Sequence, residues 1–401
     1  MNKQFSTIID FDRTISRSDS LAEKWNKPRL INFFGSSDLL PFWVADMEFQ
    51  APQLVIDSLI KRAQNGVYGY ESSPEGLLKS VVQWYSKRCN WNINHDNICI
   101  SRGILNAIAL LIQLHTKEGD GIIIQPPVFF EFRLLIRDNN REVVRNPLKV
   151  SNNQYKMDFD DLETKASAPK VKMLILCNPH NPVGRVWTKD ELEKVNEICQ
   201  RHNVLVISDE IHSDIVYNKY TFTPFASISE VAAQNTFVCL SPAKTFNIAA
   251  VTDGLLIIAN DKYRQQYLKL TKRLLVNKNN AFSNVAMETA YRNGAMWLEQ
   301  LIIYLNKNIE FMKNYLIEEM PEVEMSEPEG SFLAWLNFQH LNMEAKELEQ
   351  FLAKKAKVAL NSGYWFGREG AGYARMTFAC PKLILEQGLS RISQAINTLH
   401  N

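Results

Sequence analysis

Short runs of apolar residues alternate along this chain with longer stretches in which apolar positions recur at helical spacing. We expect buried strands at residues 98–101, 121–125, 171–177, 204–208, 236–241 and 254–259. Amphipathic helices are expected between them, at residues 105–116, 189–202 and 262–275. Strands that are apolar throughout and alternate with helices predict an α/β fold with a mostly parallel sheet covered on both faces. Ligands bind such sheets beyond the carboxyl ends of the strands, so candidate chemistry is sought there.

The C-terminal part of the chain follows a different pattern. One long helix is expected at residues 295–319, followed by a segment at 331–338, strands at 358–361 and 373–379, and helices at 344–357 and 383–399. The first 45 residues or so show no strong helical periodicity. We therefore predict an N-terminal arm with part of a small domain (1–50), a large domain (51–290) and a small α+β C-terminal domain (291–401).

Composition excludes several classes of protein. The 401 residues are 46% hydrophobic, and 45 basic residues balance 44 acidic ones, which gives no electrostatic case for nucleic acid or an anionic membrane. Asp10, Asp12 and Arg13 stand where a signal peptide needs an apolar run, and no uncharged apolar stretch is long enough to span a bilayer. The six cysteines form no C-x-x-C pair, so we expect free thiols, no metal and a cytoplasmic location.

A lysine follows one of the predicted strands. Lys244 stands in Ser-Pro-Ala-Lys-Thr-Phe-Asn (241–247), among apolar and small residues. Burial of an ammonium group disfavours its charged form, and a lysine with a lowered pKa can form a Schiff base with a carbonyl compound. A loop lysine that points into water is the alternative interpretation of this stretch taken alone.

Polar side chains follow other predicted strands. Asp209 and His212 come after the strand at 204–208. They could form a solvated turn or a weak metal site, or Asp209 could pair with a cationic ring nitrogen. Asn181 stands in the turn Asn-Pro-His-Asn-Pro-Val-Gly (178–184), where it could donate a hydrogen bond to a ligand. Gly103 opens a strand-to-helix turn whose N–H groups make an anion site, to which Ser241 could add a hydroxyl.

In this order, the motifs resemble those of fold-type I enzymes that use pyridoxal 5′-phosphate (PLP), within the class I and II aminotransferase superfamily. A narrower resemblance is to bacterial cystathionine β-lyases and cystalysin-like C–S lyases. It rests on the sequences at 41–47, 68–70, 177–187, 209–212 and 244–247 and covers essentially the whole chain. It implies a large domain with a mostly parallel seven-stranded sheet between helices, plus a smaller α+β domain.

The resemblance also implies roles for individual residues. Lys244 is the Schiff-base lysine and the base at the substrate Cα, Asp209 pairs with the pyridinium nitrogen, and Asn181 bonds the ring hydroxyl. Arg375 clamps the substrate carboxylate, for which a guanidinium fork is well shaped. The phosphate is implied to bind at Gly103, Ile104, Leu105 and Ser241, and the pyridine ring to stack on Phe129. His212 is a further implied cofactor-binding position. Ala45 and Asp46 are implied substrate-binding positions, and Tyr70 reaches the phosphate of the neighbouring subunit of a homodimer.

Two departures distinguish a lyase from an aminotransferase. Many aminotransferases of this superfamily carry arginine eight residues after the lysine and tyrosine three residues after the aspartate, where this chain has Thr252 and His212. Both favour α,β-elimination from S-substituted L-cysteines, which gives a thiol, pyruvate and ammonia. An aminotransferase is the first alternative, and a PLP-fold protein with a regulatory binding role is the second.

A further departure leaves the leaving-group acid open. Related lyases commonly have tyrosine where this chain has Phe129 and Phe130, and phenylalanine cannot donate a proton. Lys244, Tyr70, another group or water must then protonate the departing sulfur, or the enzyme prefers a different substrate. Ala243 and Ala250 stand where related sequences often have serine and glycine, which suggests a local rearrangement around the lysine.

Overall fold

The chain is built around a seven-stranded sheet, seen in a computed structural model that describes residues 8–17 and 20–399. Strand β10 runs antiparallel to both of its neighbours, and the other pairs are parallel. In spatial order the strands are β2 (Ile98–Ser101), β10 (Gly254–Ile257), β9 (Thr236–Leu240), β8 (Leu205–Asp209), β7 (Val171–Cys177), β3 (Gly121–Ile124) and β4 (Glu142–Arg145).

The predicted strands are present in this sheet, with ends that differ from the predicted ones by no more than two residues. Strand β4 has no counterpart among them. It lies at the edge of the sheet, and its four residues are exposed or only partly buried, so it lacks the continuous apolar run of a central strand.

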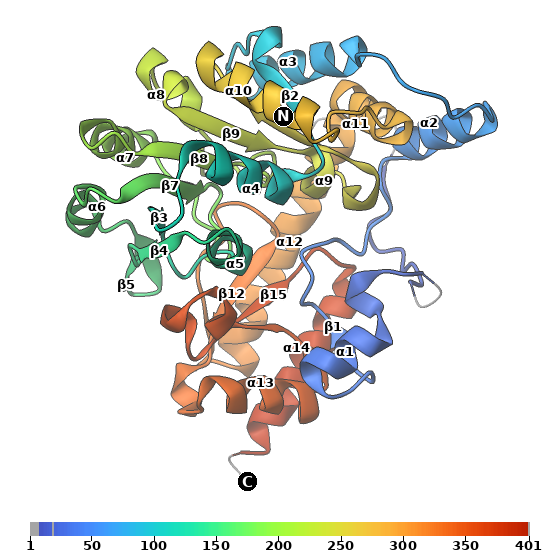
Figure 1. The fold of residues 1–401 in the computed structure, drawn as a ribbon. Coiled ribbons are helices and arrows are strands. Elements are labelled where there is room, and N and C mark those ends of the chain that lie inside the picture. The colour runs from blue at the N-terminus through green and yellow to red at the C-terminus, as the bar shows by residue number, and fades with distance from the viewer. Residues whose placement is uncertain (1–7, 18–19, 400–401) are drawn as a thin grey trace.

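Helices cover both faces of the sheet (Figure 1). Ile122 and Ile124 pack with one group of helices, whereas Ile123 points to the opposite face and packs with another. The first group contains α4 (Ile104–His115), α5 (Phe130–Asp138) and α10 (Asp261–Arg273), and the second contains α6 (Phe159–Ala166) and α7 (Lys189–Arg201). The other helices of this region are α2 (Gln53–Gln64), α3 (Glu75–Cys89), α8 (Glu230–Gln234), α9 (Pro242–Thr245) and α11 (Ala281–Asn293).

The C-terminal part forms a separate four-stranded antiparallel sheet beside three helices. Its strands, in order, are β11 (Glu324–Met325), β12 (Leu333–Asn337), β15 (Tyr373–Thr377) and β14 (Asn361–Ser362), and its helices are α12 (Ala295–Glu319), α13 (Ala345–Lys354) and α14 (Lys382–Asn397). The bounds of α12 coincide with the predicted ones. The strand predicted at 358–361 is divided, because β13 (Val358–Ala359) pairs with β1 (Leu40–Pro41) whereas β14 pairs with β15.

The N-terminal segment corrects one expectation, because it contains a helix, α1 (Lys27–Phe34). The Asn26 side chain accepts a hydrogen bond from the Arg29 N–H, and Gly35 ends the helix with a φ of 78°. Leu30 and Phe34 are its buried residues, too few for a strong periodic pattern. Residues 1–7 of the predicted arm lie outside the described residues, and the domain boundaries at 50 and 290 stay predictions.

A small hairpin of β5 (Lys149–Ser151) and β6 (Gln154–Lys156) completes the strands of the described chain. Within residues 8–17 and 20–399, no helix is long and apolar enough to cross a lipid bilayer. All six cysteine thiols are free, and five of them are buried.

Candidate active site

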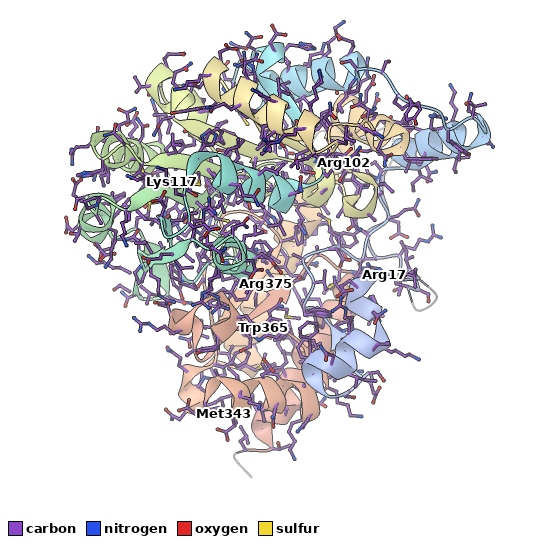
Figure 2. The ribbon with its side chains drawn as sticks, in the orientation of Figure 1. Arg17, Arg102, Lys117, Met343, Trp365 and Arg375 are labelled. Atoms are coloured by element: carbon purple, nitrogen blue, oxygen red, sulfur yellow. The ribbon has the colours of Figure 1, made fainter. Side chains whose placement is uncertain are left out.

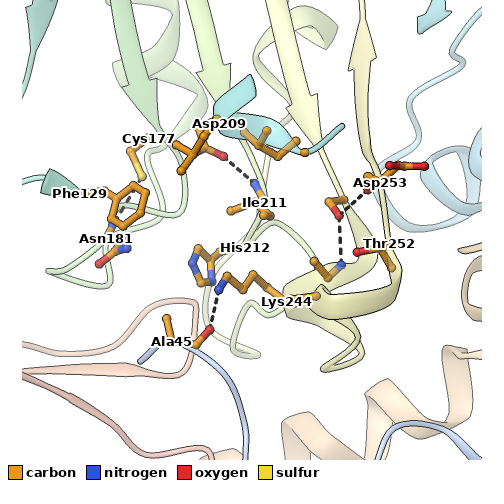
Figure 3. A pocket seen from close by; sticks show the side chains of 16 residues that line it. Ala45, Phe129, Cys177, Asn181, Asp209, Ile211, His212, Lys244, Thr252 and Asp253 are labelled. Carbon is orange, nitrogen blue, oxygen red and sulfur yellow. Dashed lines mark hydrogen bonds between the residues drawn. The ribbon is translucent and has the colours of Figure 1, made fainter. Parts of the chain in front are cut away.

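A cavity of about 240 Å³ lies at the carboxyl ends of β7, β8 and β9 (Figure 3). This is the edge at which parallel sheets bind ligands. Its lining residues are Ala45, Gly103, Ile104, Leu105, Phe129, Cys177, Asn181, Asp209, Ile211, His212, Ser241, Ala243, Lys244, Ala249, Thr252 and Asp253.

Lys244 is held on α9, directly after β9. Ser241 caps this short helix by accepting a hydrogen bond from the Ala243 N–H, and Pro242 occupies its first position. The Lys244 Nζ donates to the Ala45 carbonyl oxygen at 2.6 Å (Figure 3). Burial lowers the pKa of Lys244 to about 8, so a neutral amine is accessible near neutral pH.

Asp209 is the last residue of β8, and its carboxylate is buried. One carboxylate oxygen accepts a hydrogen bond from the Ile211 N–H at 3.2 Å. Burial raises the pKa of Asp209 to about 6, against the opposing effects of this hydrogen bond and of the Lys244 charge. A buried carboxylate of this kind is suited to a cationic partner in the cavity.

Asn181 and Arg375 are brought together from parts of the chain that are far apart in sequence. Arg375 Nη1 donates to Asn181 Oδ1 at 3.0 Å, and Nη2 donates to the Trp43 carbonyl oxygen at 2.7 Å and to Asn361 Oδ1 at 2.6 Å. Burial lowers the pKa of Arg375 to about 9. Arg375 stands on β15 of the C-terminal sheet, where Figure 2 labels it.

The other end of the cavity is formed by backbone and hydroxyl groups. Gly103 precedes α4 with a φ of 103°, a conformation that favours glycine, and opens the N-terminus of a 12-residue helix toward the cavity. Ser241 Oγ donates to the Asp253 carbonyl oxygen at 3.1 Å. A Cβ on Gly254 would come within 3.0 Å of the Gly103 carbonyl carbon, so the two walls of this end approach closely.

Two further predicted cofactor-binding residues also line the cavity. Phe129 precedes α5 and contacts the Phe132 ring edge-on, with ring centroids 5.5 Å apart. His212 is buried, and its Nδ1 lies 3.0 Å from Ser331 Oγ. Burial holds the pKa of His212 well below its ordinary value, with the nearby Lys244 and Arg375 charges acting in the same direction, so its ring is neutral.

Asp46 and Tyr70 lie outside this cavity lining. The Asp46 carboxylate pairs with Arg17 at 2.6 Å and with Lys24 at 2.7 Å. The Tyr70 side chain is 96% exposed, which fits a residue directed away from its own chain but does not place it in a site. Their assigned roles stay predictions.

Asn361 accepts the shortest of the Arg375 hydrogen bonds and is not among the site residues predicted from the sequence. A polar residue at the end of the predicted strand 358–361 is the available signal, and its pairing with Arg375 is fixed by the antiparallel register of β14 and β15. Thr252 and Asp253 also line the cavity; Thr252 stands where many aminotransferases of the superfamily carry arginine, and nothing in the sequence pointed to Asp253.

The residues present fit PLP. The cavity joins an amine of lowered pKa, a buried carboxylate for a ring nitrogen, and a glycine-opened helix N-terminus with a serine for a phosphate. Among the described residues, no group of three or more histidine, cysteine, aspartate or glutamate side chains is placed to hold a metal ion.

Two of the known proteins with similar sequences come from Bacillus subtilis and Escherichia coli. The chain is 38% identical to cystathionine beta-lyase PatB of Bacillus subtilis, over 97% of this chain and 100% of that one. It is 32% identical to protein MalY of Escherichia coli, over 98% of this chain and 100% of that one.

Solved structures of other proteins are similar to this chain in both fold and sequence. Cystalysin from Treponema denticola, which contains a pyridoxal 5′-phosphate cofactor, matches with a TM-score of 0.94 at 33% identity, covering 98% of this chain and 100% of that one. A PLP-bound putative aminotransferase from Clostridium difficile also matches with a TM-score of 0.94, at 44% identity, covering 97% of this chain and 100% of that one. The aminotransferase class I and II profile matches residues 42–392, and this chain therefore belongs to that family.

Proposed function

We propose that this chain is a PLP-dependent C–S lyase, which cleaves S-substituted L-cysteines to a thiol, pyruvate and ammonia. The observation that carries the proposal is one cavity that holds the Lys244 amine and the Asp209 carboxylate, with Arg375 bonded to its lining residue Asn181. The name of the relative PatB, a cystathionine beta-lyase, supports the lyase direction.

PLP, when bound, supplies an electron sink for the negative charge that develops at the substrate Cα. Lys244 would hold the cofactor through its aldehyde, Asp209 its ring nitrogen, and Ser241 with the α4 N-terminus its phosphate. Lys244 Nζ then takes the proton from Cα, since a pKa of about 8 leaves a usable fraction of neutral amine near neutral pH.

Arg375 binds and orients the substrate. Its hydrogen bonds reach only neutral oxygens, those of Asn181, Trp43 and Asn361, so the guanidinium charge is available to a substrate carboxylate. Binding of the carboxylate fixes the position of Cα relative to Lys244. This orientation lowers the entropic part of the barrier to proton transfer.

Elimination also needs a proton for the departing sulfur. Phe129 and Phe130 carry no acidic hydrogen, and the His212 ring is neutral with its Nδ1 beside Ser331 Oγ. We propose that Lys244 Nζ is the donor, because it carries the proton that it has taken from Cα. Breakage of the Cβ–S bond with transfer of that proton to sulfur releases the thiol.

The proposed assembly is a homodimer in which Tyr70 contributes to the partner's active site. Tyr70 is almost fully exposed, and Val67 and Tyr68 beside it are 70% and 58% exposed. Neighbouring exposed apolar side chains of this kind are typical of a surface that another protein covers.

The experiment that tests the function uses cystathionine and PLP-loaded protein, with no 2-oxo acid added. We expect catalytic formation of pyruvate and free thiol in equal amounts. Lys244→Ala should abolish both, because no other residue is assigned to take the Cα proton. Lys262→Ala, which removes an exposed lysine of α10, is the matched control and should keep full activity.

The outcomes separate the two enzyme classes. Amino-group transfer that begins only when a 2-oxo acid is supplied, with no pyruvate or thiol before that, would contradict the lyase proposal and support an aminotransferase. Repeating the assay with other S-substituted cysteines distinguishes a wrong substrate from a wrong reaction.

A further inference from the structure

Residues 43–49 form a segment that we call the strap. Two of its charged side chains meet two from the N-terminal segment that precedes it. The four, which we call the arm cluster, are Arg17, Lys24, Asp46 and Glu48. Lys24 Nζ lies 2.7 Å from Asp46 Oδ1 and 2.9 Å from Glu48 Oε1. Arg17 Nη2 lies 2.6 Å from Asp46 Oδ2, and Nη1 lies 3.0 Å from Glu48 Oε1. The cluster therefore joins two cations to two carboxylates.

Lys24 is buried to an unusual degree for a lysine, with a side chain that is 1% exposed. Besides the two carboxylates, its Nζ bonds the backbone carbonyl oxygen of Asp46 at 2.7 Å. Burial alone would lower the pKa of Lys24, but Glu48 and Asp46 raise it above its ordinary value. The ammonium is thus charged and fixes both the backbone and the side chain of the strap.

The other side of the strap contacts the proposed catalytic groups. The Ala45 carbonyl oxygen accepts from Lys244 Nζ at 2.6 Å, and the Trp43 carbonyl oxygen accepts from Arg375 Nη2 at 2.7 Å. Figure 3 shows Ala45 beside Lys244, and Figure 2 shows Arg17 on the side of the molecule where the N-terminal segment runs. Lys244 of the cavity bonds the carbonyl oxygen of Ala45, and Lys24 of the arm cluster bonds that of Asp46. The two lysines therefore bond consecutive carbonyl groups of the strap.

Charged and titratable groups from several elements face Lys244. They are Asp46 from the strap, Lys24 from the N-terminal segment, Arg375 from β15, Asp209 from β8, and His212 just after β8. Burial is the main cause of the lowered pKa of Lys244; the Asp46 and Asp209 charges oppose it, and the Arg375 and Lys24 charges reinforce it. The arm cluster therefore contributes one charge that raises the pKa of Lys244, that of Asp46, and one that lowers it, that of Lys24.

We propose that Lys24 and Asp46 are positioning residues for Lys244, which hold the Ala45 carbonyl against its amine and balance the charge that the amine experiences. The inference rests on the proposed function, in which Lys244 binds PLP. It gives Asp46 a role through the strap instead of direct contact with substrate.

The test measures PLP capture by the full-length protein stripped of cofactor, followed by absorbance as a function of pH. Only the neutral amine attacks an aldehyde, so the pH midpoint of the capture rate reports on Lys244. Lys24→Met removes a positive charge and should move the midpoint upward, by about half a pH unit or more. Asp46→Asn removes a negative charge and should move it downward by a similar amount. Opposite shifts are expected only from a charge effect on the amine.

Lys27→Met is the matched control, because it removes an exposed lysine three positions away and should leave the midpoint unchanged. Circular dichroism and thermal melting establish that each variant is folded, and Asp46→Asn, which keeps the side-chain shape, serves if Lys24→Met does not fold. Midpoints that stay at the wild-type value, or that move in the same direction, would overturn the inference. Failure of the wild-type protein to capture PLP would instead overturn the proposed function.

Discussion

Arg375 carries a buried charge whose hydrogen-bond partners in the described chain are all uncharged. Its guanidinium lies over the Phe366 ring, with 5.0 Å from Cζ to the ring centroid, and its Nε is buried with no hydrogen-bond partner. A buried cation without a carboxylate is costly, which is why its pKa falls to about 9. Such an arrangement is useful where a ligand provides the missing negative charge.

Arg375→Gln should therefore weaken substrate binding while leaving cofactor binding intact. Loss of a hydrogen bond to a charged group costs about 1.5–3 kcal/mol, so we expect KM for the amino-acid substrate to rise about 10- to 200-fold. The PLP dissociation constant, measured on the same protein, should change little. Arg391→Gln, on the exposed face of α14, is the control and should behave as wild type. An unchanged KM in Arg375→Gln would remove Arg375 from the substrate site.

At the scale of elements, the end of the cavity that we propose holds the phosphate is a junction between two antiparallel strands and a helix. Gly254 of β10 pairs with Ser101 of β2, next to the N-terminus of α4. Arg102 Nη1 bonds both carboxylate oxygens of Asp253, at 3.2 and 3.3 Å, across this junction. The ion pair links the two walls and neutralises a carboxylate near the place expected to hold a phosphate.

Arg102→Ala should consequently weaken PLP binding through the phosphate. The Asp253 carboxylate would remain near a dianion without its partner, and we expect a loss of about tenfold in PLP affinity. Affinity for pyridoxal, which lacks the phosphate, should stay unchanged in the same titration. Asp253→Asn removes the repulsion and should not reproduce the loss. Equal weakening of both ligands in Arg102→Ala would indicate a general structural role.

Local patterns in the sequence were sufficient to predict the central strands and the residues that follow them. Asp209 ends β8 and Lys244 comes just after the neighbouring parallel strand β9, so topology alone brings them to the same edge of the sheet. The contacts of Asp46 and Asn361 could not be predicted this way, because their partners lie on elements that pack only in the tertiary structure. The helix α1 and the edge strand β4 carry too few buried residues to produce a clear period.

On the scale of the whole molecule, the candidate site draws on three parts of the chain. The large sheet provides Asp209 and the lysine after β9, the C-terminal sheet provides Arg375 from β15, and the strap provides the carbonyl groups that both cations bond. Movement of the C-terminal sheet relative to the large sheet would therefore change the position of the guanidinium that we propose binds the substrate. In the proposed homodimer a fourth part, the segment around Tyr70, comes from the other subunit.

Shared sites in a dimer can be tested by mixing two impaired proteins. Tyr70→Ala keeps its own Lys244 but gives the partner no tyrosine, whereas Lys244→Ala has no lysine but offers an intact Tyr70. A mixed dimer then holds one site with both groups and one with neither. Random reassociation makes about half of the dimers mixed, so activity should recover to about a quarter of the wild-type value. If Tyr70 served its own chain, every site of the mixed dimer would lack one group and mixing would restore nothing. Co-purification of one variant through an affinity tag that only the other variant carries shows that mixed dimers have formed, and absence of recovery from these mixed dimers would contradict the assignment of Tyr70.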